Sequence, residues 1–401
     1  MKSRFSFCIF FLAILSLGRS QLPVRFDNEY KTIFAKDLCK LASNNPDLLL
    51  LDVRSPGEFR DTSSYNSLNM GHLKSAINIP IDTILKNIAV LTPFKDKTLV
   101  LYCSHSQRSR RVSLLLSKNG FKNFYNLNGG MSQINQMGEK EFPCKKDWFE
   151  SNLGYANLST KDAIKLLESD PKPFILDVRP AAVFSSRDSL IQNNIGRIKS
   201  ATNIPYTELK HRLNELPKEK RQAILIYGQS GDGDAARTAI ELKTNGFSKV
   251  FVLLAGLDDL LSQQNGSHLV EYAPLFKLLD ARGAIALLKD NNGITIYDVR
   301  PKIEYENKKP PQEYYLNLGN IKNAINIEEK DFSVYNYPKE KKTPILIYGR
   351  GEAYKLAQKL SGEGYEKIYV MRGLYDFVSS AFNVEGCRDA LLFLENHDGF
   401  Y

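Results

Sequence analysis

The most regular feature of the chain is the alternation of short apolar runs with longer stretches of helical periodicity. The runs that end at Asp52, Tyr102 and Tyr227 are almost continuously apolar, which is typical of strands buried on both faces of a parallel sheet. The stretches between them space apolar residues as helices do and end at breakers such as Asn45-Pro46. The pattern predicts α/β architecture, with doubly wound, mainly parallel sheets and helices on both faces.

This alternation occurs three times. Each copy has an apolar run ending in Asp-Val-Arg, a Gly-x-Leu/Ile-Lys segment, a second apolar run, a helical stretch and a glycine turn. The spacing between the two apolar runs is identical in the three copies. The same number of positions separates Asp52 from Cys103, Asp177 from Gly228, and Asp298 from Gly349. The repeat predicts three consecutive domains at 21–149, 150–268 and 269–401, joined by linkers near 145–158 and 262–274.

The first 20 residues differ from the rest of the chain. A basic start is followed by the apolar segment Phe5–Leu17 and by the small residues Gly18 and Ser20, which predicts a signal peptide over residues 1–20. The protein is therefore expected to be exported, into a periplasm or the medium. The apolar run is shorter than the roughly 20 residues of a membrane span, so we expect no stable membrane insertion. A retained anchor is the alternative.

Charge and cysteine content narrow the class of protein. The formal net charge of +9 is mild for 401 residues, and no Lys/Arg tract with interleaved aromatics points to nucleic acid. A mild positive charge is compatible with small anionic substrates. Four cysteines follow the predicted signal peptide, too few for a disulfide framework. Cys39 and Cys144 flank the first repeat, and either a disulfide in an oxidising compartment or two unpaired thiols fits them.

Cys103 is the candidate nucleophile. It ends a predicted buried strand, and a helical pattern containing Ser109–Lys118 begins shortly after it. A loop bent between strand and helix would turn backbone N–H groups toward the sulfur, and the helix N-terminus adds partial positive charge. With Arg108 nearby, these features favour the nucleophilic thiolate.

The second and third copies have no cysteine at this position. Gly228 and Gly349 stand there, so neither copy has a nucleophile. The second loop carries Asp232 and Asp234 near the place of Arg108, which opposes anion binding. Both copies are predicted to be inactive.

The chain resembles the rhodanese sulfurtransferase family in four features, taken in order. They are the Asp52–Arg54 strand end, the Glu58-Phe59 pair, the segment Gly71–Pro80 and the Cys103 loop. The resemblance extends over three tandem rhodanese-like domains, of which the first alone has the active-site cysteine. It implies that Cys103 takes sulfur from a small anionic donor such as thiosulfate and passes it, as a persulfide, to a thiol or cyanide. No cofactor and no metal are implied.

The resemblance also assigns roles within the loop. Arg108 would hold the anionic donor, and the loop would cradle the outer sulfur of the persulfide. The loop residues are Ser104, His105, Ser106, Gln107 and Ser109. The family often has glycine where Ser106 stands, so a positive φ there would strain the serine. His105 is expected to face solvent, with proton transfer as its alternative role.

The sequence leaves several alternative functions open. Related cysteine phosphatases place arginine six positions after the cysteine, whereas Arg108 follows at five, which favours a sulfur atom over a phosphoryl group. A second class of function is a rhodanese-fold scaffold or sulfur carrier that does not turn over. Since a thiolate is easily oxidised outside the cytoplasm, a thiol-reducing protein partner is a further possibility.

The Asp-Val-Arg motif is expected to be structural, because it recurs in copies that lack the cysteine. Asp52 is the aspartate of this motif in the first copy. The spacing predicts that Arg54 pairs with Glu58, and that Arg300 pairs with Glu304 in the third copy. Such pairs are individually weak when they lie at the surface.

Overall fold

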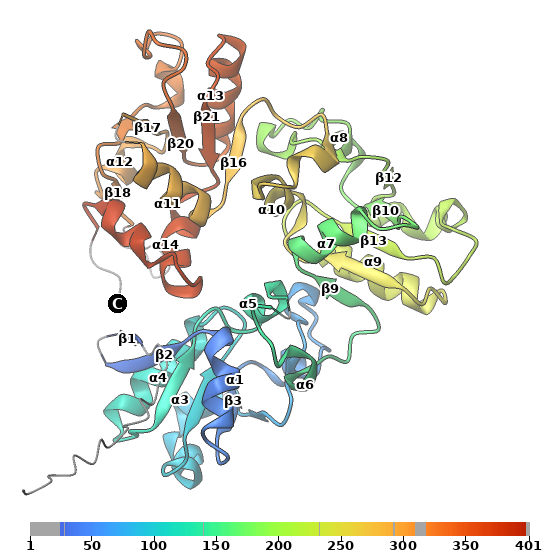
Figure 1. The fold of residues 1–401 in the computed structure, drawn as a ribbon, viewed down its shortest axis with the longest axis vertical. Helices are drawn as coiled ribbons and strands as arrows, with labels where there is room; N and C mark the ends of the chain where they lie inside the picture. The colour runs from blue at the N-terminus through green and yellow to red at the C-terminus, as the bar shows by residue number, and fades with distance from the viewer. Residues whose placement is uncertain are drawn as a thin grey trace, which may run out of the picture.

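The structure, a computed structural model, describes residues 25–27, 29–138, 140–231, 233–291, 293–308 and 318–397. The predicted signal peptide at residues 1–20 lies outside the described residues, as does Asp232. Figure 1 shows three α/β units that follow one another along the chain and surround a common centre. The first is blue and cyan, the second green and yellow, and the third orange and red.

The sheet of the first unit has the strand order β1-β2-β7-β6-β3-β5, and all neighbours are parallel except β1 and β2. These strands are β1 (Arg25–Asp27), β2 (Tyr30–Ile33), β3 (Leu49–Asp52), β5 (Ile77–Asn78), β6 (Leu99–Tyr102) and β7 (Phe124–Leu127). The helices are α1 (Ala35–Ser43), α2 (Pro56–Phe59), α3 (Ile81–Lys86), α4 (Gln107–Lys118), α5 (Gly130–Gln136) and α6 (Lys145–Trp148), with 3-10 turns at Asn66–Leu68 and Ile88–Phe94. Helices α1 and α5 pack on one face of the sheet and α3 and α4 on the other.

The second unit repeats this plan with a five-stranded parallel sheet in the order β12-β10-β13-β14-β9. Its strands are β9 (Ala156–Leu158), β10 (Phe174–Asp177), β12 (Thr202–Asn203), β13 (Ile224–Tyr227) and β14 (Val250–Leu253). Its helices are α7 (Thr160–Leu167), α8 (Ala181–Phe184), α9 (Gly233–Thr244) and α10 (Gly256–Ser262), with 3-10 turns at Ile191–Asn193, Tyr206–His211, Leu213–Glu215 and Ser267–Leu269.

The third unit has the same arrangement, with strand order β16-β21-β20-β17-β19, all parallel. Its strands are β16 (Lys277–Leu279), β17 (Thr295–Asp298), β19 (Ile325–Asn326), β20 (Ile345–Tyr348) and β21 (Ile368–Met371). Its helices are α11 (Ala281–Asp290), α12 (Lys302–Tyr305), α13 (Gly351–Gly362) and α14 (Leu374–Asn383), with 3-10 turns at Glu329–Asp331 and Arg388–Phe393. The predicted doubly wound α/β fold is confirmed in all three copies.

A small antiparallel pair of strands closes each unit. These pairs are β4 (His72–Leu73) with β8 (Phe149–Glu150), β11 (Arg197–Ile198) with β15 (Val270–Glu271), and β18 (Asn320–Ile321) with β22 (Leu394–Glu395). Because β15 pairs within the second unit, that unit extends past the predicted boundary at residue 268. The connecting segments are accordingly 151–155 and 272–276, shorter than the linkers predicted from composition.

The Asp-Val-Arg motif forms the same buried ion pair in each unit. Arg54 is 0% exposed, donates to Asp52 through Nε and Nη2, and also donates to the carbonyl oxygen of Gly71 at 2.7 Å. The predicted pairs of Arg54 with Glu58 and of Arg300 with Glu304 were therefore wrong. The arginine side chain folds back over its own strand end, where Asp52 is already buried.

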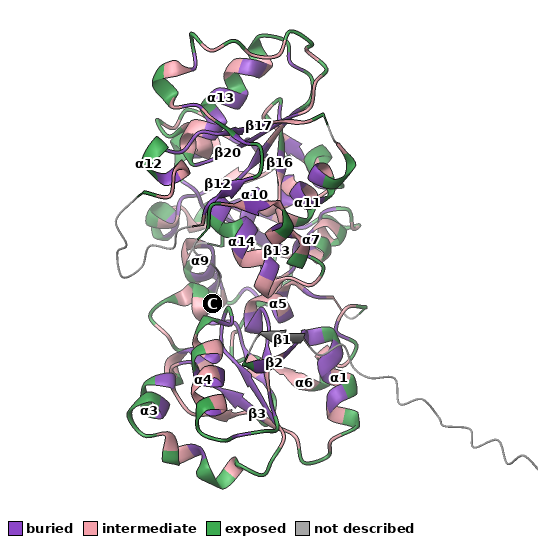
Figure 2. Ribbon diagram, turned by 90° about the vertical axis from the view of Figure 1, so that its left-hand side faces the viewer, coloured by how far each residue is buried: buried purple, intermediate pink, exposed green. Residues whose placement is uncertain are grey.

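The three units are joined in two different ways. One hydrophobic cluster runs without interruption from the second unit into the third, combining residues such as Leu257, Leu260, Phe276 and Tyr354. The first unit has clusters of its own on its two faces. Figure 2 shows the buried strands at the centre of each unit. Units two and three thus share a core, whereas the first unit does not.

Cys39 in α1 and Cys144 before α6 form a disulfide, the first of the two arrangements that the sequence left open. Among the described residues, no helix has both the length and the apolar character that a membrane crossing requires.

Candidate active site

Cys103 lies at the carboxyl end of β6, in the middle of the first sheet, and is 1% exposed. The amides of Met131 and Ser132 donate to the carbonyl oxygens of Cys103 and Ser104, at 3.0 and 2.9 Å. A Cβ on Gly130 would lie 2.1 Å from the Cys103 carbonyl oxygen, so this close approach needs glycine. The start of α5 therefore fixes the Cys103 loop from one side.

From the other side, the loop leads directly into α4, whose N-terminal end favours negative charge near the sulfur. Ser106 precedes this helix with φ +71°, the left-handed conformation in which serine is strained. It is fully buried, and its hydroxyl donates to the carbonyl oxygen of Leu127 at 3.2 Å. The predicted conflict between a positive φ and serine at this position is present in the structure.

A buried polar network lies beneath the sulfur. The Ser109 hydroxyl lies 3.8 Å from Cys103 Sγ and donates to Asn126 Oδ1 at 2.6 Å. The Asn126 amide in turn donates to Asn128 Oδ1 at 2.7 Å. Since each buried polar group here has a partner, the network holds the loop in one conformation.

Arg108 forms a bidentate ion pair with Glu58, with both N–O distances at 2.6 Å, and donates to the Ser104 hydroxyl at 3.0 Å. These bonds use three of its five N–H donors, and Arg108 also interacts with the Cys103 thiol. Burial opposes the charge on Glu58, but hydrogen bonds from Arg108 and Ser55 outweigh it and lower its pKa. Glu58, expected to be a scaffold partner of Arg54, instead orients the arginine of the loop.

Arg54 keeps one guanidinium nitrogen outside its ion pair with Asp52. Its Nη1 is buried and has no hydrogen-bond partner among the described residues. In the second unit, the equivalent Nη1 of Arg179 donates to Gln229 Oε1 at 2.8 Å. Gln229 directly follows Gly228, and Ser104 directly follows Cys103. Ser104 makes no such bond to Arg54, and its hydroxyl instead accepts a hydrogen bond from Arg108.

The remaining loop residues point outward. His105 is exposed, as expected, and lines a cavity between the units. Its place in the cavity removes part of its hydration, and this desolvation and the charge of Arg108 lower the pKa of His105. Gln107 is exposed and donates to the Tyr375 hydroxyl of the third unit at 2.9 Å. Sequence reasoning missed this contact, because nothing in the local sequence indicates which part of another repeat lies against the loop.

The two cysteine-free loops are arranged differently from the first. In the second unit Gln229 also donates to Asp258, whose pKa burial raises to about 6. Asp234 pairs with Arg237 of the same helix. In the third unit, a Cβ on Gly349 would lie 2.6 Å from Val299 Cγ2, so the site has little room for a larger residue.

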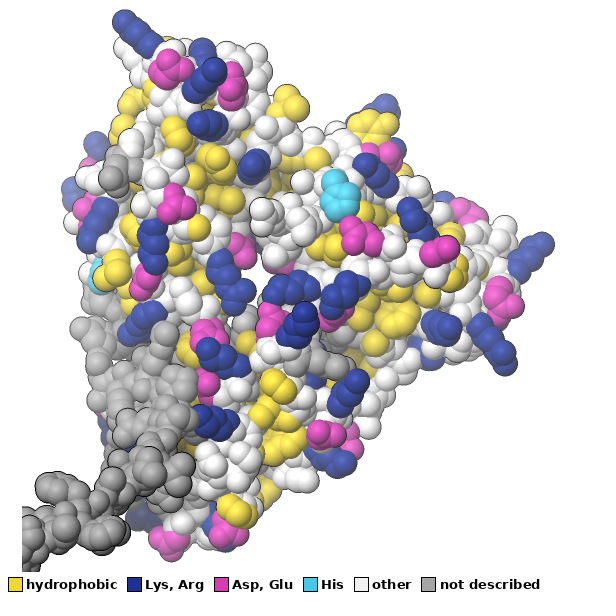
Figure 3. Space-filling view, in the orientation of Figure 1, with side chains coloured by type: hydrophobic (Ala, Val, Ile, Leu, Met, Phe, Trp, Pro, Cys, Tyr) yellow, Lys and Arg dark blue, Asp and Glu magenta, His cyan; other side chains and the backbone are white. Residues whose placement is uncertain are grey.

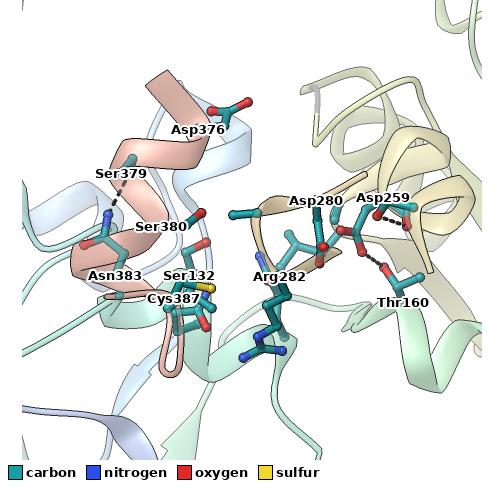
Figure 4. Close-up of a pocket in the computed structure, with 18 of the residues that line it drawn as sticks. Ser132, Thr160, Asp259, Asp280, Arg282, Asp376, Ser379, Ser380, Asn383 and Cys387 are labelled. Atoms are coloured by element: carbon teal, nitrogen blue, oxygen red, sulfur yellow. Dashed lines mark hydrogen bonds between the residues drawn. The ribbon is translucent and has the colours of Figure 1, made fainter. Parts of the chain in front are cut away.

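The cavity has a volume of about 1010 Å³ and is lined by residues of all three units. Figure 3 shows basic and acidic side chains gathered where the units meet, and Figure 4 shows the walls that α14 and the second unit contribute. In the described parts of the chain, no group of three or more His, Cys, Asp or Glu side chains is placed to hold a metal ion.

Comparison with known proteins relates the chain to one family. Residues 35–137, 159–263 and 281–379 each match the rhodanese-like domain. The tRNA uridine(34) hydroxylase of Photorhabdus laumondii is 33% identical over 120 residues, which cover 28% of this chain and 32% of that protein. Its counterpart in Hamiltonella defensa is 32% identical over 119 residues, covering 27% of this chain and 31% of that protein. The match thus spans about a third of the length of these relatives.

Parts of the chain also match solved structures. The thiosulfate sulfurtransferase of Pseudomonas aeruginosa is 17% identical with a TM-score of 0.24, covering 86% of this chain and 67% of that one. EanB is 16% identical with a TM-score of 0.27, covering 88% and 97%. A rhodanese-related protein of Thermoplasma volcanium is 30% identical with a TM-score of 0.21, covering 26% and 89%.

Proposed function

The chain belongs to the rhodanese-like family, and from this premise we propose that its first unit is a sulfurtransferase that carries sulfur on Cys103. The observation that carries the proposal is the setting of this thiol. Cys103 stands between the end of a buried strand and the N-terminus of α4, and it interacts with Arg108, which Glu58 and Ser104 hold in place. The glycines at 228 and 349 leave the other units without a cysteine at the equivalent position.

In the first step, the Cys103 thiolate attacks the outer sulfur of an anionic donor such as thiosulfate. A bond forms between the two sulfurs, the bond to the sulfonate sulfur breaks, and its electron pair leaves on sulfite. The persulfide keeps the negative charge that the thiolate brought. Arg108, whose side chain is partly exposed, would bind the donor's anionic oxygens.

In the second step, an acceptor attacks the outer sulfur of the persulfide. With cyanide, a carbon–sulfur bond forms, the persulfide S–S bond breaks, and Cys103 regains its electron pair as a thiolate. The Arg108–Glu58 pair is neutral overall, so Arg108 adds little net charge and acts mainly by directing its hydrogen bonds. The N-terminus of α4 supplies the positive potential that favours the thiolate in both steps.

We further propose that the protein acts outside the cytoplasm. The disulfide between Cys39 and Cys144 supports this, because disulfides persist in oxidising compartments. The basic and apolar pattern of residues 1–20 supports it independently. A thiol-reducing partner would then keep Cys103 reduced. If Cys103 stays reduced or persulfidated in protein isolated without reductant, no such partner is needed.

The test is thiocyanate formation from thiosulfate and cyanide by residues 21–401, with Cys103→Ala and Cys387→Ala as paired variants. We expect the parent to form thiocyanate and Cys103→Ala to form none. Intact-mass measurement should find one added sulfur on the parent and on Cys387→Ala, and none on Cys103→Ala. A persulfide without turnover would indicate a sulfur carrier, and absence of both would indicate a scaffold.

A further inference from the structure

We propose that the third unit positions the Cys103 loop, and that Arg110 and Asn383 are the positioning residues through which it does so. The proposal rests on the sulfur transfer proposed above and adds a requirement to it. A path of hydrogen bonds leads from the end of α14 to the Ser109 hydroxyl beside the sulfur. A unit without the cysteine thereby takes part in the chemistry of the first.

The path begins at the sulfur. The Ser109 hydroxyl lies 3.8 Å from Cys103 Sγ and donates to Asn126 Oδ1, and the Asn126 amide donates to Asn128 Oδ1. Arg110 Nη2 also donates to Asn128 Oδ1, at 3.3 Å. Ser109, Asn126 and Asn128 are buried, so water hardly competes for these bonds. The four residues from Ser109 to Arg110 are called the Ser109 network below: Ser109, Asn126, Asn128 and Arg110.

Arg110 continues the path into the third unit, at the side of that unit which faces the first (Figure 1). Its Nη2 donates to the Phe382 carbonyl oxygen at 2.8 Å and to Asn383 Oδ1 at 3.1 Å. The guanidinium also lies 5.2 Å from the centre of the Phe382 ring. Because a single nitrogen bonds acceptors of both units, a shift of α14 also disturbs the bond to Asn128.

Asn383 is itself held in place and contacts the first unit a second time. Its side-chain amide donates to Ser379 Oγ at 3.0 Å, one turn earlier on α14, as Figure 4 shows. Its carbonyl oxygen lies against Gly129, where a Cβ would approach it to 2.6 Å. Gly129 directly precedes α5, whose first residues fix the Cys103 loop. The end of α14 therefore contacts both α4 and the start of α5.

The equivalent positions in the other two units are apolar. Valines stand in place of Asn126, as the strand registers show, and alanines stand in place of Ser109 when counted from the glycine turn after the helix. These residues are Val252, Val370, Ala235 and Ala353. Since the same fold forms without these polar groups, the Ser109 network belongs to the cysteine and not to the fold.

The network acts on the sulfur through the place of one hydroxyl. Ser109 has a single proton to donate, and a negatively charged sulfur nearby is an acceptor that can compete with Asn126 for it. That exchange requires the hydroxyl to stay beside the sulfur. Without Arg110, Asn128 loses a partner and can turn, which frees Asn126 and then Ser109. Contact with the third unit thus keeps the hydroxyl where the sulfur can use it.

The experiment breaks the path at its two ends. Ser109→Ala removes the hydroxyl beside the sulfur, Arg110→Ala removes the bonds between the units, and Asn383→Ala weakens them without changing any charge. Lys36→Ala is the matched control. Lys36 pairs with Glu385, just beyond Asn383, and so joins the same two units outside the network. Circular dichroism and Trp148 fluorescence check that each variant is folded.

The first measurement is thiocyanate formation from thiosulfate and cyanide. We expect kcat to fall about tenfold in Ser109→Ala and Arg110→Ala, with KM for thiosulfate little changed because Arg108 still binds the donor. Asn383→Ala should lower kcat about threefold, since the Phe382 carbonyl oxygen remains as an acceptor. Lys36→Ala should have almost no effect, because partly exposed ion pairs are weak. A rise in KM with unchanged kcat in Arg110→Ala would show that Arg110 binds the donor, and would overturn the proposal.

Two further variants test the path itself. Because the path ends at Ser109, the double variant Ser109→Ala/Arg110→Ala should have the kcat of Ser109→Ala alone. Two losses that multiply would mean that Arg110 acts by another route, and would overturn the proposal. Asn383→Asp gives Arg110 an acceptor again and should restore kcat to the parent value. A variant Asn383→Asp as slow as Asn383→Ala would likewise overturn it.

A second measurement is independent of turnover. Amide hydrogen exchange, followed by mass spectrometry, reports how firmly residues 103–112 are held. Exchange there should become faster in Asn383→Ala, although the substitution lies in another unit, and should not change in Lys36→Ala. Unchanged exchange in Asn383→Ala, or an equal change in Lys36→Ala, overturns the proposal. If the parent forms no thiocyanate, the sulfurtransferase proposal fails and exchange still decides the positioning; if it does and Asn383→Ala changes neither kcat nor exchange, the positioning alone fails.

Discussion

The first and second units build the same strand end but use the space beside it differently. In both, an arginine is buried against the aspartate two residues before it, and a tyrosine hydroxyl accepts a bond from a nearby backbone amide. In the second unit Gln229 bonds the Nη1 of Arg179, whereas no described residue bonds the Nη1 of Arg54 in the first unit. The comparison indicates that the fold needs the ion pair, whereas the residue after the strand end is free to differ.

The largest expected effect is loss of the shared ion pair. Asp52→Asn leaves the Arg54 charge buried without its partner and should lower the free energy of unfolding of the first unit by about 3–5 kcal/mol. The single tryptophan, Trp148, lies in this unit, so its fluorescence in urea reports the first unit alone.

Asp177→Asn is the matched variant in the second unit. It should destabilise that unit by a similar amount, visible by circular dichroism, with little change in the transition of Trp148. If Asp52→Asn leaves the fluorescence midpoint in place, the buried pair is not the structural element that the two units share.

The next largest effect concerns Glu58, which the second unit replaces with Val183. Glu58→Gln removes the charge that orients Arg108 and should lower kcat/KM for thiosulfate by about ten- to a hundredfold, as for the loss of a charged hydrogen-bond pair. In the third unit, Glu304 holds Arg350 in a similar pair at 3.1 Å. Glu304→Gln should leave thiosulfate turnover within twofold, because no sulfur lies beside it. Equal losses in both variants would contradict the assignment.

A smaller effect is expected from making the first loop resemble the second. Ser104→Gln gives the first loop the longer side chain that bonds Arg179 in the second unit, and this side chain should crowd the donor at Arg108. We expect KM for thiosulfate to rise about tenfold, with a smaller change in kcat, because one charge-assisted contact is lost. Ser104→Ala is the control, since it removes the hydroxyl without lengthening the side chain. A rise in KM as large in the control would show that the hydroxyl, rather than the crowding, matters.

The smallest effect concerns Ser106, whose counterpart Gly231 also has a positive φ of 42°. Ser106→Gly should relieve the left-handed strain but lose one buried hydroxyl contact. Because each of these amounts to about 1 kcal/mol, the net stability change should stay within about 1 kcal/mol of zero. Thermal unfolding of the first unit, followed by Trp148 fluorescence, measures it. A loss above 2 kcal/mol would show that the bond to Leu127 outweighs the strain.

Much of the fold follows from local signals in the sequence. Continuous apolar runs such as Leu99–Tyr102 predict central strands, and repetition of the same order three times predicts three units. The partner of Arg54 was predicted wrongly because spacing along the chain suggested Glu58. The structure instead buries Arg54 against Asp52, since the side chain turns back at the end of the strand.

The candidate site was predictable only in part. Cys103 and its loop stand out because the same position is glycine in two otherwise matching repeats. The contacts of Gln107 with Tyr375 and of Arg110 with Phe382 join residues more than 250 positions apart. No local pattern encodes which faces of two repeats meet, so the cavity and its charges could not be derived from the sequence.

The three units around the cavity are held together by two kinds of contact. One depends on apolar packing, and the strength of the other depends on the ionic strength. A shared apolar core holds the second unit to the third, and salt hardly weakens such burial. Ion pairs such as Lys36–Glu385 and Lys161–Glu141 help hold the first unit to the others, and dissolved ions screen exposed pairs over about 8–10 Å. The salt concentration around the protein therefore sets how firmly the cysteine-bearing unit closes against its two neighbours.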